Sequence, residues 1–426
     1  MDSIVHYDVI IIGAGQAGLS TSYLLKQNSI DHIVLDRGEI GESWRKRWDS
    51  FFLNSPNKFN LLPGDRIDPQ HADGFMSGQQ YIEKLVHYSH QHQLPVQTNT
   101  EVIAVTKSPE SDFFNVAVNR NGQSQTLFSK SVVVASGGQN FPILPSISKQ
   151  FPSSLFQIHS DDYRHPDQLP KGAVLIIGSA TSGVQIAEEL AATGKKVYMS
   201  TSAVARIPRQ YRGLDCIEWL SMMGFFDKPT AMAEPHELHM KAPLMSGIGD
   251  KGHTLSLQSL QKQGVILLGY LKSIQGYTLT FEDNLIDHLQ FGDMFSGQVK
   301  GGINQFIEAT NNPAPAAEID EADQPVDLSL FQERILELDL NQNNITSVIW
   351  TTGFTGNFNW IKLPVLNEKG QPIHDNGVSA IPNLYFMGIP WLRNLKSSLI
   401  YGTKEDAEAV TTSLLQNLHS NVKVIP

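Results

Sequence analysis

The stretch VIIIGAGQAGLS, residues 9–20, decides the fold class of this chain. A run of branched apolar residues is typical of a buried parallel strand, and a helical pattern follows it after spaced glycines. Gly13 permits a tight turn out of the strand, Gly15 leaves room for a pyrophosphate, and Gly18 lets the helix lie close to the sheet. The pyrophosphate would rest on free N–H groups at the positive end of the helix. The stretch therefore predicts a dinucleotide-binding β-α-β unit.

The residues around this motif give it the expected context. The helix AGLSTSYLLKQ follows the motif, Gln16 and Ala17 are expected to contact the nucleotide, and a second strand, HIVLD, ends at Asp36. This is close to the spacing at which an acid binds the ribose hydroxyls of a dinucleotide. The alternative is an ordinary strand-turn-helix with a solvated Asp. We predict that Asp36 binds the ribose.

A near copy of the motif, VLIIGSATSGVQ, returns at residues 174–185. Ala180 stands where the middle glycine would be, and its methyl group narrows the approach of a phosphate without forbidding it. The repeat predicts a second dinucleotide site, whose loop consists of Gly178, Ser179, Thr181, Ser182 and Gly183.

No acid ends the strand that follows the second copy. The sequence continues from Ser200 as STSAVARIPRQYRG, and an arginine here is the usual way to accept a 2′-phosphate. We therefore predict that the second nucleotide is NADP, bound by Ser200 and by Arg206, the arginine nearest the strand end. Arg209 and Arg212 stay open as alternatives, as does a solvated basic loop.

Composition limits the remaining function classes. The 426 residues can form two or three domain cores, and the single cysteine, Cys216, excludes a dithiol redox pair. A formal charge of −11 argues against nucleic acid as a partner. The apolar run at residues 9–12 is too short to span a bilayer, and the N-terminus lacks a basic leader region. We expect a soluble cytoplasmic protein that needs no metal ion.

The organisation follows from where strand-like and helix-like segments fall. A helix is predicted from Ser77 or Gly78, antiparallel strands at 101–106, 113–118 and 125–134, and a helix near 297–309. The segment near 310–326 is rich in Pro, Ala and acids and predicts an irregular linker or mobile loop. We predict an α/β fold with two Rossmann-like domains. The first comprises residues 1–165 and 335–426, and the second, residues 166–334, is inserted in it.

Further motifs, in this order and spacing, resemble those of the class B flavoprotein monooxygenases, which include flavin-containing, N-hydroxylating and Baeyer-Villiger enzymes. The matching segments are GESWRKRW, ASGGQNFPILP, HSDDY, WTTGF and NLYFMGIPW. The resemblance implies that FAD occupies the first site and NADP the second. It also implies cofactor contacts from Arg37, Trp44, Arg45, Ala135, Gly137, Gly353 and Gly388.

The resemblance implies a reaction as well. NADPH would reduce FAD, O₂ would form a C4a-hydroperoxyflavin, and its distal oxygen would pass to a nucleophilic nitrogen or sulfur of a small molecule. Asn54 matches the place of an asparagine that this family sets against the flavin, and it is the expected catalytic residue. His159, from HSDDY, would orient the hinge between the domains.

Three functions stay open. A heteroatom-oxygenating monooxygenase is favoured over a Baeyer-Villiger enzyme or a non-oxygenating NAD(P)H:flavin oxidoreductase, and over a non-catalytic flavoprotein. Tyr163 stands where a Baeyer-Villiger enzyme normally carries Trp, and GIPW replaces a glycine-aspartate pair at Gly388. The substrate and the oligomeric state, for which a homodimer is one option, are left open.

Overall fold

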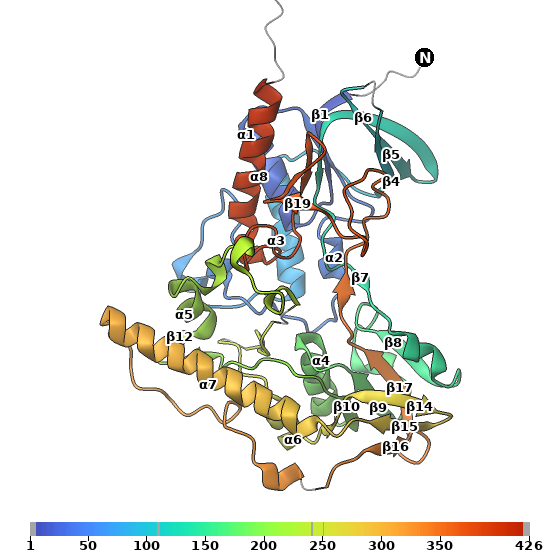
Figure 1. The fold of residues 1–426 in the computed structure, drawn as a ribbon, viewed down its shortest axis with the longest axis vertical. Helices are drawn as coiled ribbons and strands as arrows, with labels where there is room; N and C mark the ends of the chain where they lie inside the picture. The colour runs from blue at the N-terminus through green and yellow to red at the C-terminus, as the bar shows by residue number, and fades with distance from the viewer. Residues whose placement is uncertain (1–5, 109–110, 240–241, 250, 332, 421–426) are drawn as a thin grey trace, which may run out of the picture.

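The computed structural model describes residues 6–108, 111–239, 242–249, 251–331 and 333–420. Within these ranges the chain is a mixed α/β structure organised around two sheets, one with a parallel centre and one wholly parallel, which form the upper and lower halves of Figure 1. None of the helices in the described ranges combines the length and apolar character that a bilayer-spanning helix needs.

The first sheet has nine strands in the order β19-β20-β21-β6-β1-β2-β3, with β5 paired to β6 and β4 paired to β5. Its centre, β1, runs parallel to both β2 and β6, and Val9, Ile10 and Ile11 on β1 are fully buried. The predicted antiparallel insert is confirmed, because β4 pairs with β5 and β5 with β6. The strands are β1 (His6–Ile12), β2 (His32–Leu35), β3 (Val96–Gln97), β4 (Thr100–Lys107), β5 (Phe114–Arg120), β6 (Gln123–Val134), β19 (His374–Asp375), β20 (Val378–Ser379) and β21 (Leu384–Phe386).

The second sheet has five parallel strands in the order β13-β10-β9-β17-β8. An antiparallel three-stranded sheet, β14-β15-β16, accompanies it. The strands are β8 (Phe156–His159), β9 (Ala173–Ile177), β10 (Val197–Ser200), β13 (Ile266–Leu268), β14 (Leu271–Gln275), β15 (Thr278–Phe281), β16 (Glu337–Asp339) and β17 (Ile345–Trp350).

Sheet membership corrects both predicted domain boundaries. β8 lies before residue 166 and β17 lies after residue 334, yet both pair within the second sheet. The second unit therefore begins before β8 and ends after β17. The strands β7 (Phe141–Pro142) and β18 (Phe354–Thr355) pair with each other where the chain passes between the two sheets.

Helices cover both sheets. The helix predicted from Ser77 or Gly78 is confirmed, with Ser77 as N-cap and Gln80 completing a capping box. The helix predicted near 297–309 is longer, since α7 begins at Leu285. The α-helices are α1 (Gln16–Gln27), α2 (Glu42–Arg45), α3 (Gly78–Gln91), α4 (Thr181–Ala192), α5 (Cys216–Met222), α6 (Leu257–Lys262), α7 (Leu285–Thr310) and α8 (Ile400–Ser420).

The acidic segment after α7 is irregular, as predicted, but it is anchored to the second unit. Asp323 is 4% exposed and accepts hydrogen bonds from Arg206, Ser296 and Lys300. Asp320 accepts one from Thr254. The segment that composition predicts as a linker or mobile loop is thus attached to the second unit, because a buried carboxylate with three donors holds it in place.

Candidate functional site

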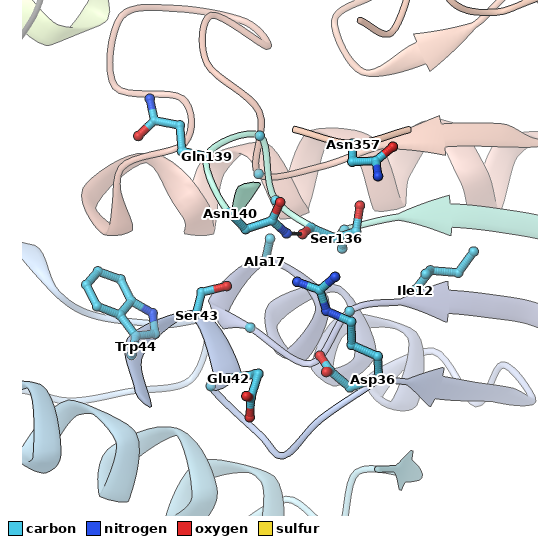
Figure 2. A pocket seen from close by; sticks show the side chains of 18 of the residues that line it. Ile12, Ala17, Asp36, Glu42, Ser43, Trp44, Ser136, Gln139, Asn140 and Asn357 are labelled. Atoms are coloured by element: carbon cyan, nitrogen blue, oxygen red, sulfur yellow. Dashed lines mark hydrogen bonds between the residues drawn. The ribbon is translucent and has the colours of Figure 1, made fainter. Parts of the chain in front are cut away.

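A cleft lies at the carboxyl ends of β1, β2 and β6, where open α/β sheets usually bind ligands. Figure 2 shows side chains facing it from opposite walls. Trp44, Glu42 and Asp36 lie on one wall, and Asn357 and Gln139 on the other. Ser398, two residues before α8 begins, also lines the cleft and has a left-handed φ of 74°. The last helix, α8, therefore starts beside the cleft.

The first glycine loop forms a tight cradle. A Cβ on Gly18 would lie 1.9 Å from the carbonyl oxygen of Gly13, and one on Gly13 would lie 2.3 Å from that of Ala135. A Cβ on Gly15 would meet no protein atom within 4 Å. Gly13 and Gly18 are thus required by close packing, whereas Gly15 faces open space. This arrangement leaves room for a phosphate group against the first turn of α1.

Asp36 holds the loop as well as facing the cleft. Its carboxylate accepts hydrogen bonds from the backbone N–H of Ala14 (2.6 Å) and of Gly38 (2.9 Å). Burial raises the pKa of Asp36, while these two N–H groups oppose that shift. Trp44 is fixed by its indole N–H, which donates to Gln16 at 3.1 Å.

The cleft brings together most residues predicted for the first nucleotide. These are Gly13, Gly15, Gln16, Ala17, Asp36, Arg37, Trp44, Ala135, Gly137 and Gly388. Three other predicted residues do not line it. Gly18 lies beneath the loop, Gly353 lies next to the lining residue Phe354, and Arg45 turns its Nε to the carbonyl oxygen of Ile40.

Several residues that line the cleft were not predicted from the sequence, although they belong to the motifs that carry the family resemblance. Lys46 and Arg47 lie in GESWRKRW, Ser136 and Asn140 in ASGGQNFPILP, and Asp161 in HSDDY. Arg47 lies over the ring of Phe354, with its guanidinium carbon 4.9 Å from the ring centroid. Burial lowers the pKa of Arg47, and Asp161 opposes that shift. Position within these motifs marks them as candidates but does not indicate which side chains face the cleft.

The second glycine loop repeats the geometry of the first. A Cβ on Gly183 would lie 2.3 Å from the carbonyl oxygen of Gly178, and one on Gly178 would lie 2.7 Å from that of Thr351. Ala180 has φ −74° and ψ 177°, close to the φ −82° and ψ −175° of Gly15. An alanine is tolerated there because this extended conformation suits any residue. Both loops are thus built to approach a pyrophosphate, although the second does not line the cleft described above.

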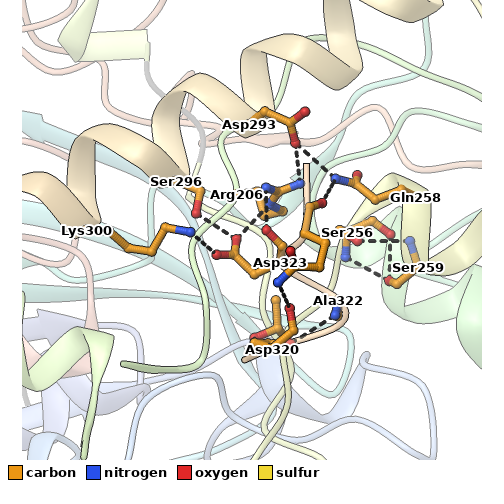
Figure 3. A network of polar contacts seen from close by, with 12 residues as sticks. Arg206, Ser256, Gln258, Ser259, Asp293, Ser296, Lys300, Asp320, Ala322 and Asp323 are labelled. Carbon is orange, nitrogen blue, oxygen red and sulfur yellow. Dashed lines mark hydrogen bonds and ion pairs between the residues drawn. The ribbon is translucent and has the colours of Figure 1, made fainter. Parts of the chain in front are cut away.

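Arg206 is not free to bind a 2′-phosphate, which corrects the prediction made for it. It is 3% exposed, and Figure 3 shows its guanidinium between two carboxylates, Asp293 at 2.7 Å and Asp323 at 2.9 Å. The anionic partners of the Arg206 guanidinium are therefore two carboxylates of the same chain and not a 2′-phosphate.

The alternatives to Arg206 are also engaged. Arg209 is 2% exposed and pairs with Asp215, and Arg212 donates to Pro315 and Asn304. Ser200 is buried as well, where its hydroxyl donates to the carbonyl oxygen of Gly269. Ser179 bonds to the backbone of Ser202 and thereby supports the second loop from behind.

Asn54 lies between the two units rather than among the residues that line the cleft. Its Oδ1 accepts a hydrogen bond from Gln185 on α4, and its backbone oxygen accepts one from Arg209. His159 is 4% exposed at the end of β8 and packs edge-to-face on Phe354. Burial lowers its pKa. Cys216 is buried, which raises the pKa of its thiol, and it is the only cysteine in the sequence.

Comparison with known proteins agrees with this fold. The family model described as pyridine nucleotide-disulphide oxidoreductase matches residues 10–212. The chain is 30% identical over 410 residues to the uncharacterized oxidoreductase CzcO of Bacillus subtilis (strain 168), covering 96% of this chain and 99% of that protein.

Solved structures show the same overall architecture. A flavin-containing monooxygenase from Stenotrophomonas maltophilia superposes with a TM-score of 0.64 at 18% identity, covering 97% of this chain and 100% of that one. The ornithine N-hydroxylase of Kutzneria sp. 744, with reduced FAD, NADP⁺ and L-ornithine, superposes with a TM-score of 0.63 at 13% identity, covering 97% and 100%. The chain therefore belongs to the family of the CzcO oxidoreductases, and it shares its fold with flavin-containing and N-hydroxylating monooxygenases.

Proposed function

We propose that this protein is an NADPH- and O₂-dependent flavin monooxygenase that oxygenates a nucleophilic nitrogen or sulfur atom of a small molecule. The observation that carries the proposal is the duplicated cradle, in which Gly13 with Gly18 and Gly178 with Gly183 both pack too closely for a Cβ. Two dinucleotide sites suit an enzyme that reduces one bound cofactor with another. A single cysteine leaves no dithiol for the alternative chemistry of a disulfide reductase.

FAD would lie in the cleft of the first unit. Its pyrophosphate would rest at Gly15, and the carboxylate of Asp36 would accept the ribose hydroxyls. Lys46 and Arg47 add positive charge to the same cleft. When bound, FAD accepts a hydride from NADPH and activates O₂. The protein supplies position and a site shielded from water.

The nicotinamide dinucleotide would lie on the second loop, against the first turn of α4. Thr181 and Ser182 open that helix and are only half-buried, so their groups are accessible. NADP is supported by the ornithine N-hydroxylase, a structural neighbour whose structure holds NADP⁺. Its 2′-phosphate would have to find partners other than Arg206 and Arg209, since both guanidinium groups pair with carboxylates.

Asn54 is the residue we propose to face the flavin edge. It lies in the segment between the two units, where a reacting flavin and a nicotinamide would meet. Its carboxamide can donate two hydrogen bonds and accept others. Such a group can form hydrogen bonds with the flavin without acting as an acid or a base.

The experiment is a substrate screen with the purified, FAD-loaded protein. Amines, thioethers and ketones are offered with NADPH under ¹⁸O₂, and products are analysed by mass spectrometry. We expect one ¹⁸O atom in an amine or thioether product and substrate-stimulated NADPH consumption. Oxidation of ketones to esters would indicate the Baeyer-Villiger alternative. NADPH consumption that yields only H₂O₂ with every substrate would contradict an oxygenase.

A further inference from the structure

Gln185 contacts Asn54 in a way that leaves only one orientation for both carboxamides. Gln185 lies on α4 and is 4% exposed. Its Nε2 donates to the backbone oxygen of Met245 at 3.0 Å and to Oδ1 of Asn54 at 2.9 Å. A backbone carbonyl oxygen can only accept, so the Nε2 end of Gln185 must face Met245.

This constraint passes to Asn54. Because the Nε2 end of Gln185 can only donate, the atom of Asn54 that faces it must be the acceptor, Oδ1. The backbone of Asn54 is held separately, since Nη1 of Arg209 donates to its carbonyl oxygen at 2.6 Å. Among the described residues, no hydrogen bond is found from Nδ2 of Asn54. The donor end of this carboxamide therefore points away from α4.

We propose that Gln185 is a positioning residue, which fixes the carboxamide of Asn54 so that Nδ2 is the group offered to the flavin. The inference rests on the proposed function, because it assigns the flavin as the partner of that donor. The main-chain carbonyl of Met245 thus fixes the orientation of the Gln185 carboxamide, which in turn fixes the orientation of the Asn54 carboxamide.

A second contact of α4 provides a matched control. Glu189, one turn after Gln185, accepts hydrogen bonds from Ser50 at 2.7 Å and from Tyr163 at 2.6 Å. It thus also joins α4 to the segment that carries Asn54, but it does not touch the Asn54 carboxamide. Loosening α4 in general should affect both contacts, whereas losing the orientation of Asn54 should affect only Gln185.

The test uses four variants of the full-length, FAD-loaded protein. Gln185→Glu presents oxygen atoms to Asn54 and should invert its carboxamide. Gln185→Met is neutral, keeps the bulk and removes the donor. Asn54→Asp replaces the donor end with oxygen, and Glu189→Gln is the control. The first readout is the visible absorption spectrum and the midpoint potential of bound FAD, measured without O₂ or NADPH. The second is the ratio of H₂O₂ to oxygenated product.

We expect Gln185→Glu and Asn54→Asp to shift the flavin spectrum in the same direction and to lower the midpoint potential of FAD. The reason is that the reduced flavin would no longer be stabilised by the hydrogen bond from Nδ2 of Asn54. Gln185→Met should shift both in the same direction by less, and Glu189→Gln should match the unmutated protein. Loss of one such hydrogen bond should raise the H₂O₂ ratio by roughly five- to a hundredfold.

Several outcomes would overturn the proposal. A shift from Gln185→Glu without one from Gln185→Met would indicate a charge effect, and an equal shift from Glu189→Gln would indicate general loosening of α4. No shift from Asn54→Asp, or a protein that takes up no FAD, would leave the donor without its assigned partner. If the unmutated protein makes only H₂O₂ while the spectral shifts follow the expected order, the oxygenase function fails and the role of Gln185 stands.

Discussion

Replacing Arg206 with Ala should destabilise the second unit instead of selectively weakening NADPH binding. The change leaves Asp323, 4% exposed, and Asp293 facing each other without the guanidinium between them. Removing one partner of a buried ion pair typically costs about 3–5 kcal/mol. Lys300 still pairs with Asp323 at 2.6 Å, so we expect the lower end of that range, about 3 kcal/mol.

The measurement is thermal unfolding combined with nucleotide titration. A cost of about 3 kcal/mol corresponds to a Tm lower by about 6–12 °C for a unit of this size. Arg212→Ala is the control, because that guanidinium donates only to a carbonyl and an amide oxygen. A variant that unfolds within about 2 °C of the unmutated protein, yet binds NADPH tenfold more weakly with NADH unaffected, would refute the reasoning and return Arg206 to the 2′-phosphate.

Three further predictions follow from single residues. Gly15→Ala should leave the unfolding of the apoprotein nearly unchanged but reduce FAD retention on gel filtration, whereas Gly18→Ala should impair folding itself, since its Cβ would lie 1.9 Å from the oxygen of Gly13. Burial raises the pKa of Asp406 from 3.8 to about 6, which costs about 3 kcal/mol above pH 7, about half of that at pH 5 and almost nothing below about pH 3. Asp406→Asn should therefore raise Tm at pH 7.5 by about twice as much as at pH 5, and an equal gain at both would contradict this. Stopped-flow reduction should favour NADPH over NADH by less than about tenfold, because no charge-assisted contact from Arg206 is available.

Features set by neighbouring residues could be predicted from the sequence. The two β-α-β units and the helix start at Ser77 or Gly78 both depend on short-range patterns. The domain boundaries could not be placed in this way. β8 and β17 pair with each other across the whole inserted unit, so their membership of the second sheet depends on partners far away in the chain. Lys46 and Arg47 were missed because the quoted motif does not say which of its side chains face the cleft.

A local sequence pattern can correctly predict that a residue binds an anion and still be wrong about which anion it binds, as Arg206 shows. The sequence placed an arginine shortly after a strand without an acid, which is the arrangement that accepts a 2′-phosphate. The anions that it meets come from α7 and from the acidic segment after it, at Asp293 and Asp323. That segment reads as a linker by composition because its acids have no local partners. A basic loop and an acidic segment without local partners are therefore better considered together when they occur in one chain. They can form ion pairs with each other, and the basic residues are then not available to a ligand.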